Sequence, residues 1–124
     1  MALFSDGRVM PYGTMGGEGQ PQTQAAVFTR YAMYGQDLQT AVTAPRWLLG
    51  RTWGSDAANL RIENRFAPDV IEALKAAGHD VEVVGPFEET MGHAGALVAH
   101  RSSDRAGTIE GASDPRSDGR AAGF

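Results

Sequence analysis

The sequence predicts an α+β protein in which a mixed or antiparallel sheet is packed against a few helices. Two observations predict this class. Short apolar runs separated by turn residues recur along the chain, which is typical of strands. Three stretches carry the proline, capping and spacing signals of helices. The predicted order, β-β-α-α-β-β-α-β-β-β, lacks the regular strand–helix alternation of a parallel α/β fold.

The chain begins with a predicted hairpin that leads into a glycine-rich junction. Residues 2–4 and 9–12 are apolar runs on either side of Ser5–Arg8, which contains the favoured hairpin dipeptide Asp-Gly. The junction, Gly13–Gln22, lies between this hairpin and a helix predicted over residues 23–34. Its glycines allow backbone N–H groups to approach a ligand closely.

The first two helices are identified by the residues at their ends. Pro21 suits the first turn of the helix over residues 23–34, and Gly35 is a suitable stop. Asp37 can cap a second helix over residues 38–44. The apolar stripe of the first helix, which we expect to lie in the core, consists of Val27, Phe28, Tyr31 and Tyr34.

Two strands and a third helix follow. Residues 47–53 and 59–63 are apolar runs joined by a predicted surface loop, Gly54–Ala58. Residues 68–77 form the clearest helix, which begins at a proline and ends before Gly78. Its predicted buried face consists of Val70, Ile71 and Leu74.

Three strands complete the predicted order. Residues 80–84 lie between two glycines, and residues 94–100 and 107–112 flank a polar loop at 101–105. The tail at residues 113–120 is polar and rich in turn residues, and its composition is that of a flexible terminus. The sequence contains no internal repeat and no low-complexity tract.

Composition limits the classes of function. The 124 residues are enough for one domain, with ordinary hydrophobic (42%) and charged (21%) fractions. The net charge of −4 gives no electrostatic reason to expect nucleic acid or an anionic membrane surface. Because cysteine is absent, thiol nucleophiles, disulfides and thiolate metal sites are excluded. The sequence has no signal-peptide pattern and no apolar run near the ~20 residues of a membrane span, and nothing indicates a compartment.

The glycine-rich junction can serve two kinds of chemistry, phosphate binding or an oxyanion hole. Gly16-Gly17-Glu18-Gly19 matches neither the dinucleotide-binding nor the P-loop pattern, and Glu18 would lie beside a bound anion. Two consecutive glycines can supply the convergent N–H donors of an oxyanion hole without obstruction from side chains. On the local pattern alone, a glycine-rich turn without a ligand is the more frequent alternative.

The other polar residues form no recognisable catalytic or metal site. The spacing of His79, His93 and His100 is not that of metal ligands, so we expect no metal and no cofactor. No serine lies in a G-x-S-x-G motif, and no nucleophile can be named within the chain. Arg46 and Arg116 each follow a proline, and the favoured interpretation of both is a structural ion pair.

Six short segments form an ordered set that spans nearly the whole chain. Each one alone is weak, but the set is specific, above all the A-S-D-P-R sequence that ends at Arg116. The segments are Gly16-Gly17 with Gln20-Pro21-Gln22, Ala41-Val42 with Ala44-Pro45-Arg46, Leu60-Arg61-Ile62-Glu63, Val70-Ile71-Glu72-Ala73-Leu74 with Gly78-His79 and Val81, Gly111-Ala112-Ser113-Asp114-Pro115-Arg116, and Gly119 with Ala121-Ala122-Gly123-Phe124. The set resembles the C-terminal part of the small subunit of the gamma-glutamyltranspeptidase family.

This resemblance implies an N-terminal nucleophile hydrolase fold, a four-layered αββα sandwich of which residues 1–124 would be a single domain and a C-terminal fragment. The family cleaves its own precursor and exposes an N-terminal threonine, which attacks a gamma-glutamyl amide and forms an acyl-enzyme. By matching position, Gly16 and Gly17 would provide the N–H groups of the oxyanion hole. Thr14 and Met15 depart from the G-S-P-G-G sequence of many members, and Glu18 stands where a small polar residue is common.

The resemblance places the catalytic threonine and the residues that bind the glutamyl group upstream of Met1. We therefore expect a fragment that contributes the oxyanion hole to gamma-glutamyl transfer or hydrolysis on glutathione-type substrates, and that is inactive alone. Two alternatives stay open: a fragment of a cephalosporin or glutaryl acylase, which shares the scaffold, or a non-catalytic module for binding or self-association. A fragment of a layered sandwich exposes sheet edges and an apolar face, so we also expect a homo-oligomer, without a nucleic-acid or membrane partner.

Overall fold

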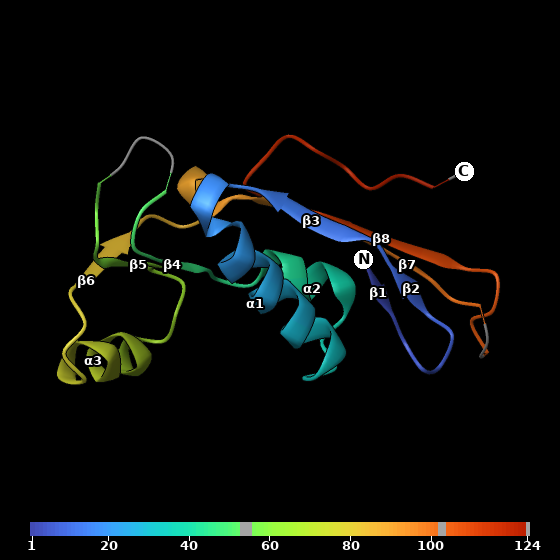
Figure 1. Cartoon of the computed structure of the whole chain (residues 1–124), viewed down its shortest axis with the longest axis horizontal. Helices are drawn as coiled ribbons and strands as arrows, with labels where there is room; N and C mark the ends of the chain where they lie inside the picture. The colour runs from blue at the N-terminus through green and yellow to red at the C-terminus, as the bar shows by residue number, and fades with distance from the viewer. Residues whose placement is uncertain (53–55, 102–103, 124) are drawn as a thin grey trace.

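The structure, a computed structural model, describes residues 1–52, 56–101 and 104–123 and consists of two sheets with three α-helices (Figure 1). A five-stranded sheet lies at one end and a three-stranded sheet at the other. Helices α1 (Gln20–Ala32) and α2 (Leu38–Thr43) pack against the larger sheet. Parts of the predicted elements fall outside the described residues, namely Trp53, Gly54, Ser55, Ser102, Ser103 and Phe124.

In the five-stranded sheet every paired strand is antiparallel to its neighbour, and β7 is central. Strand β8 pairs with one edge of β7, while β3 and β2 follow each other along the other edge. Pro11 separates these two strands, and its carbonyl accepts a hydrogen bond of 3.0 Å from Leu97 N–H. The single strand predicted at 9–12 is therefore wrong. The strands are β1 (Ala2–Leu3), β2 (Val9–Met10), β3 (Tyr12–Met15), β7 (His93–Ala99) and β8 (Ile109–Ser113).

The main core lies between this sheet and the helices α1 and α2. As predicted, Asp37 caps α2, because its Oδ1 accepts a hydrogen bond of 2.9 Å from Thr40 N–H. Tyr34 was expected in the core but is 76% exposed, because α1 ends at Ala32 and Tyr34 no longer shares the helix face. The buried apolar residues are Met10, Val27, Tyr31, Leu38, Ala41, Val42, Ala94, Ala96, Val98 and Ala112.

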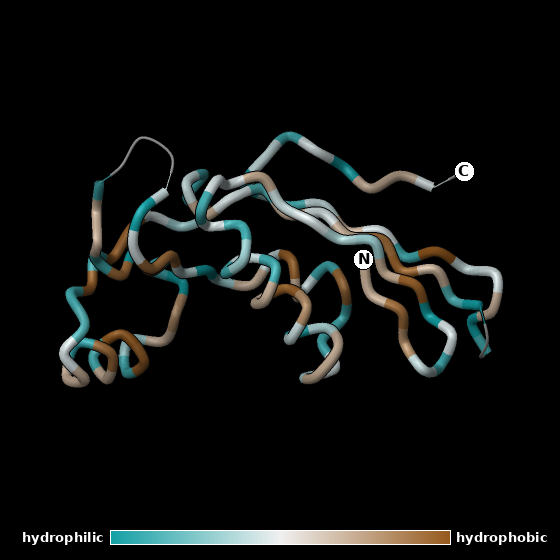
Figure 2. Tube along the Cα trace, in the orientation of Figure 1, coloured by the Kyte–Doolittle hydropathy of each residue, from teal (hydrophilic) through white to brown (hydrophobic). Residues whose placement is uncertain are grey.

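The three-stranded sheet consists of β4 (Trp47–Leu49), β5 (Leu60–Glu63) and β6 (Val81–Val84). Strands β5 and β6 are parallel, and helix α3 (Pro68–Ala76) makes the crossover between them. Figure 2 shows strongly hydrophobic residues on α3 although it lies at the periphery. The predicted buried face of this helix is wrong in part: only Ile71 is buried, while Val70 is 42% exposed and Leu74 is half-buried.

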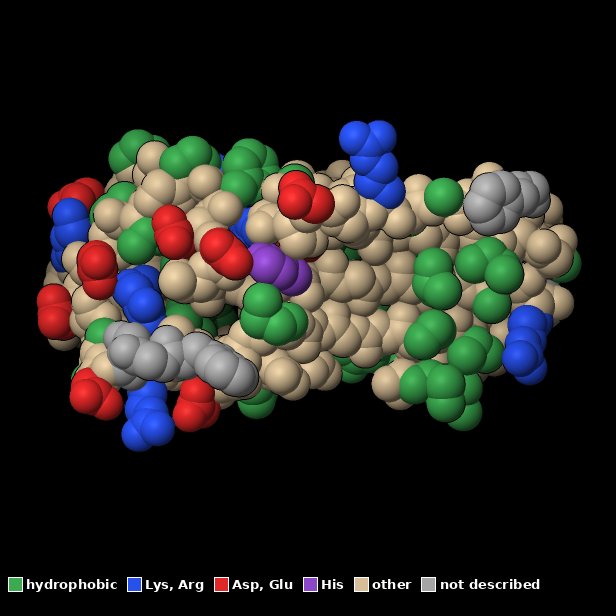
Figure 3. Space-filling view, turned by 90° about the horizontal axis from the view of Figure 1, so that it is seen from above, with side chains coloured by type: hydrophobic (Ala, Val, Ile, Leu, Met, Phe, Trp, Pro, Cys, Tyr) green, Lys and Arg blue, Asp and Glu red, His purple; other side chains and the backbone are tan. Residues whose placement is uncertain are grey.

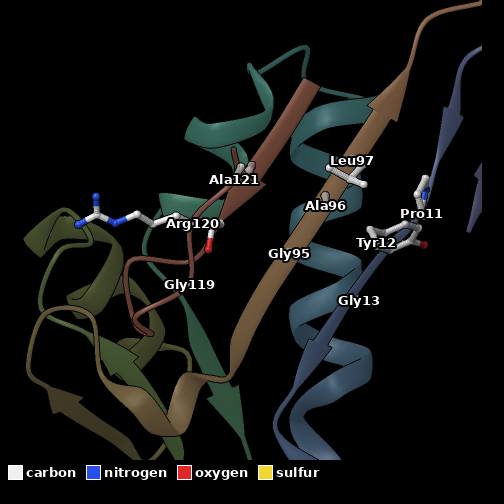
Figure 4. A pocket seen from close by; sticks show the side chains of 11 residues that line it. Pro11, Tyr12, Gly13, Gly95, Ala96, Leu97, Gly119, Arg120 and Ala121 are labelled. Atoms are coloured by element: carbon white, nitrogen blue, oxygen red, sulfur yellow. The ribbon is translucent and has the colours of Figure 1, made fainter. Parts of the chain in front are cut away.

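The face of the five-stranded sheet that points away from α1 and α2 carries exposed apolar side chains, including Leu3, Leu97 and Ile109. The segment Gly119–Ala121 passes this face and leaves a cleft of about 510 Å³ against β3 and β7 (Figure 4). None of the described helices is long and apolar enough to cross a membrane. The predicted α+β class, with antiparallel and mixed sheets covered by helices, is confirmed.

Candidate functional site

The glycine-rich junction connects β3 to α1 through a short 3-10 helix, η1 (Gly17–Gly19). Gly16 has φ = 147° and Gly17 has φ = 53°, a region of backbone conformation that strains residues with a side chain. The Gly16 carbonyl accepts hydrogen bonds from Gly19 N–H at 2.9 Å and from the Thr52 hydroxyl at 3.1 Å. The turn is therefore stabilised by a hydrogen bond within it, from Gly19, and by one from Thr52, in the segment that follows β4.

The N–H groups of Gly16 and Gly17 are the candidate donors of this site. Neither group donates to an acceptor within residues 1–52, 56–101 and 104–123, as is usual just before the first turn of a helix. Both residues are partly exposed. Two consecutive donors are thus available to an external acceptor near the N-terminus of α1, where the helix dipole favours negative charge.

Gly92 forms the opposite wall of the junction. It follows the short helix η2 (Glu89–Met91), has φ = 81°, and packs directly on the Gly16 backbone. A Cβ atom at Gly16 would lie 3.3 Å from Gly92 Cα, and a Cβ atom at Gly92 would overlap the Met15 carbonyl. The sequence did not identify Gly92, because a single glycine before a strand is indistinguishable from an ordinary turn residue.

A cleft of about 290 Å³ opens beside Gly16. Thr52 and the segment Glu88–Thr90 line it. The volume is close to the lower end of the range for small-molecule pockets. Figure 3 shows acidic side chains gathered at the end of the molecule that carries the three-stranded sheet. The complete lining is Met15, Gly16, Thr52, Glu88, Glu89 and Thr90.

Two weak charge pairs lie near the glycines. Glu18 Oε1 is 3.6 Å from Arg51 Nε, and both side chains are more than half exposed. Glu89 Oε1 is 3.9 Å from His93 Nε2, a long contact that is an ion pair only when the imidazole is protonated. Exposed pairs of this kind contribute little to stability. Glu18, the departure from the family pattern, is therefore a solvated residue paired with Arg51.

Behind the wall lies a network of four buried charged side chains, Arg46, Glu63, Asp114 and Arg116. Arg46 Nη2 is 2.6 Å from Asp114 Oδ2, and Arg116 Nη1 is 2.9 Å from Asp114 Oδ1. Arg116 also binds Glu63 through Nε and Nη2, each at 2.7 Å. The prediction that both arginines form structural ion pairs is confirmed. The composition of the tail is misleading over its first residues, because Asp114 and Arg116 are buried in this network, whereas residues 118–120 are exposed.

The network sets the protonation states of its members. Burial lowers the pKa of Arg46 to about 10, against the opposing effect of Asp114. Burial would raise the pKa of Asp114, but the Ala94 N–H and the Arg46 charge outweigh it, so this pKa lies below its ordinary value. For Arg116 the burial effect is outweighed by Glu63 and Asp114, and the pKa is raised. Arg46, Asp114 and Arg116 are therefore all charged at neutral pH.

The histidines lie in three different settings. His79 is exposed at the end of α3, as predicted for a solvated turn residue. His100 is buried, with Nε2 3.4 Å from Glu110 Oε1. His93 is half-buried at the start of β7. Within residues 1–52, 56–101 and 104–123, no group of three His, Asp or Glu side chains could hold a metal ion.

Comparison with known proteins first defines the class. The crystal structure of a cephalosporin acylase from Bacillus halodurans superposes with a TM-score of 0.77 at 30% identity, over 92% of this chain and 20% of that one. The fold is that of the N-terminal nucleophile hydrolases, which confirms the predicted fold class, part of an αββα sandwich. A family model described as gamma-glutamyltranspeptidase matches residues 1–124. The chain belongs to the gamma-glutamyltranspeptidase family, and the resemblance is confirmed.

Two curated relatives give the family context. The oxamate amidohydrolase proenzyme of Klebsiella pneumoniae is 58% identical over 123 residues, which are 99% of this chain and 22% of that protein. The glutathione hydrolase-like YwrD proenzyme of Bacillus subtilis is 50% identical over 113 residues, which are 91% of this chain and 21% of that protein. The chain thus spans about a fifth of the length of the curated relatives that it matches.

Proposed function

We propose that this chain supplies the oxyanion hole of an enzyme that cleaves small-molecule amides through an acyl-enzyme. The observation that carries the proposal is the pair of consecutive backbone N–H groups at Gly16 and Gly17, which have no acceptor in the described ranges, and of which Gly16 lines a cleft of about 290 Å³. Such donors stabilise the negative oxygen of a tetrahedral intermediate, and each is commonly worth about 3 kcal/mol. Phosphate binding is disfavoured, because Glu88 and Glu89 line the same cleft.

The proposed reaction has two halves. The Oγ of an N-terminal threonine, supplied by the part of the protein outside residues 1–124, attacks the amide carbonyl carbon. Its hydroxyl proton passes to the terminal amine, which later gives it to the leaving amine, and the π electrons move onto the oxygen. Gly16 and Gly17 N–H groups bind that oxygen while the C–N bond breaks and the amine leaves with a proton. Water or an acceptor amine then attacks the ester, which releases the acyl product and restores the threonine hydroxyl.

For the substrate we propose gamma-glutamyl amides of the glutathione type, hydrolysed or transferred. Membership of the gamma-glutamyltranspeptidase family supports this choice, and Glu88 and Glu89 favour a substrate with a positively charged amino group. A cephalosporin- or glutaryl-type amide is the second candidate, which the acylase of the same fold supports. Because the chain is 58% identical to the oxamate amidohydrolase over the matched residues, oxamate must be tested beside these substrates.

We further propose that residues 1–124 act as one domain, the C-terminal part of a gamma-glutamyltranspeptidase-like small subunit. Two features support a single unit. One apolar core unites α1 and α2 with the larger sheet. The pair of Glu63 and Arg116 ties the end of β5, in the smaller sheet, to the segment that follows β8.

A chimaera tests the proposed function. In the Klebsiella relative, the 123 residues that match this chain are replaced by it, and the hydrolysis of oxamate, gamma-glutamyl-p-nitroanilide and glutaryl amides is measured. In a second version, Gly17 is replaced by glycolic acid, which converts the backbone N–H to an ester oxygen and retains the glycine geometry. We expect this change to lower kcat about 10²- to 10³-fold with little effect on KM.

The same replacement at Gly35 is the matched control. Gly35 also has a positive φ (66°), but it lies beyond the end of α1 and outside the residues that line the cleft. We expect the control to retain the activity of the chimaera. An active chimaera whose kcat is unchanged by the ester at Gly17 would refute the oxyanion-hole assignment.

A further inference from the structure

Arg46 occupies an unusual position for a charged residue. It lies between α2 and β4, is 1% exposed, and is the largest of the fully buried side chains in the described part of the chain. Charged side chains are rarely buried to this extent unless every contact is specific. The contacts of its guanidinium group therefore indicate what it does.

The guanidinium group joins three separate segments. Nη2 donates to the Val42 carbonyl at 2.9 Å and pairs with Asp114 Oδ2 at 2.6 Å. Nη1 donates to the Gly92 carbonyl at 2.7 Å and to the Met91 carbonyl at 3.3 Å. The planar group thus connects the end of α2 and the end of β8 to the backbone at Met91 and Gly92, directly after the cleft-lining segment Glu88–Thr90.

Asp114 also binds this backbone segment. Its Oδ2 accepts a hydrogen bond of 2.7 Å from Ala94 N–H, two residues beyond Gly92. The ion pair of Arg46 and Asp114 therefore binds the backbone at Met91 and Gly92 through Arg46 and at Ala94 through Asp114. Thr23, on α1, adds a hydrogen bond of 3.1 Å to the Met91 carbonyl.

The position of the Gly92 backbone limits the position of the Gly16 backbone, because the two are in direct contact. No side chain separates the two backbones, and even a methyl group at Gly16 would lie 3.3 Å from Gly92 Cα. Close-packed groups of this kind cannot move independently. A shift of the Gly92 carbonyl, which Arg46 holds, must therefore move Gly16, the neighbour of Gly17 in the chain.

We propose that Arg46 is a positioning residue for Gly16 and Gly17, and that it acts through the Gly92 carbonyl. The proposal rests on the proposed oxyanion-hole function. A buried ion pair adds little net stability compared with apolar side chains of the same volume. The pair of Arg46 and Asp114 is therefore better explained by the backbone positions that it fixes than by the stability that it adds. Misplacement of a reacting group by about 1 Å can cost about 100-fold in rate.

The substitution Arg46→Lys tests the proposal. Lysine retains the positive charge beside Asp114, but a single ammonium group cannot also reach Val42 and Gly92 in the geometry of the guanidinium fork. In the 124-residue chain, we expect the ¹⁵N and ¹H amide shifts of Gly16 and Gly17 to change. In the chimaera, we expect kcat to fall about 10- to 100-fold while KM stays the same.

Arg65→Lys is the matched control. Arg65 touches the same network through Glu63 Oε2 at 3.3 Å and donates to the Thr43 carbonyl at 2.9 Å. Among the described residues, Arg65 donates no hydrogen bond to the Met91 or Gly92 carbonyl. A purely structural role of the network would lower the melting temperature of both variants and leave kcat per folded molecule unchanged, which would overturn the proposal.

The amide shifts separate this inference from the proposed function, because they do not depend on activity. Folded Arg46→Lys with unshifted Gly16 and Gly17 amides overturns the inference, even if the ester at Gly17 abolishes turnover. If Arg46→Lys does not fold, Asp114→Asn replaces it, since asparagine still accepts from Ala94 N–H but holds the guanidinium less firmly. The same shifts are expected, and their absence overturns the inference.

Discussion

Arg46 and Asp114 form an ion pair of 2.6 Å whose two side chains are almost completely shielded from water. Asp114 also binds Arg116 through its second oxygen, at 2.9 Å. Removal of one partner from such a pair leaves a buried charge without compensation and typically costs about 3–5 kcal/mol.

Acid should destabilise the chain through Asp114. The pKa of this carboxyl is below its ordinary value of about 3.9, so the stability it contributes is complete above pH ~4 and is lost as the pH falls through its lower folded-state pKa. We expect Asp114→Asn to be less stable at pH 7 and to lose less further stability below pH 4. Thermal unfolding followed by circular dichroism between pH 7 and pH 2 measures this.

The control for this prediction is Asp37→Asn. The pKa of Asp37 is also lowered, because it accepts hydrogen bonds from Thr40, but its side chain is exposed at the start of α2. We expect a small effect at every pH. Parallel curves of melting temperature against pH for wild type and Asp114→Asn would contradict the prediction.

Gly92→Ala should destabilise the fold more than Gly35→Ala. Both glycines have positive φ, which costs an alanine about 1–2 kcal/mol. An added methyl group at Gly35 meets open space, whereas at Gly92 it overlaps the Met15 carbonyl, and overpacking adds about 1–3 kcal/mol. Urea unfolding of the two variants gives the difference. Equal losses of unfolding free energy would contradict the contact between Gly92 and β3.

Asp37→Ala should cost about 1 kcal/mol, because α2 has only six residues and loses its N-cap hydrogen bond. Chemical denaturation measures the change in unfolding free energy. Asp118→Ala, at an exposed position of the tail, serves as the control and should be neutral. An Asp37→Ala variant as stable as that control would show that the cap contributes nothing.

The 124-residue chain should self-associate through the face of the five-stranded sheet that carries Leu97 and Ile109, which are 49% and 70% exposed. We expect a dimer or larger assembly in sedimentation velocity, and a shift towards monomer in Leu97→Glu. Val83→Glu, which changes a similarly exposed residue of β6, is the control. A wild-type chain that is monomeric at every concentration would refute this expectation.

The sequence was most informative where a local interaction decides the structure. Asp37 caps α2 and Pro68 begins α3, since both signals act within a few residues. Tyr34 was misjudged because periodicity continues past the residue where the helix ends. Val70 and Leu74 were misjudged because spacing shows which side of a helix is apolar, not whether another element covers it.

Long-range pairing was not predictable in the same way. Strand β3 contains Gly13, a poor strand former, and is stabilised by β7, a partner about 80 residues further along the chain. The glycine pair of the proposed site can be named from its motif. The wall that holds it cannot be named in this way, since the contact of Gly16 with Gly92 depends on where β7 begins.

The pairing of Glu63 with Arg116 has a consequence for the order of biosynthesis. The two residues are 53 positions apart in the chain. At about 5–20 residues per second, a ribosome makes Arg116 roughly 3 to 10 seconds after Glu63. During that interval the carboxylate has only the longer contact of 3.3 Å with Arg65, which is partly exposed, and lacks the two hydrogen bonds of 2.7 Å from Arg116. The end of β5 at Glu63 therefore stays in contact with water until Arg116 has been translated.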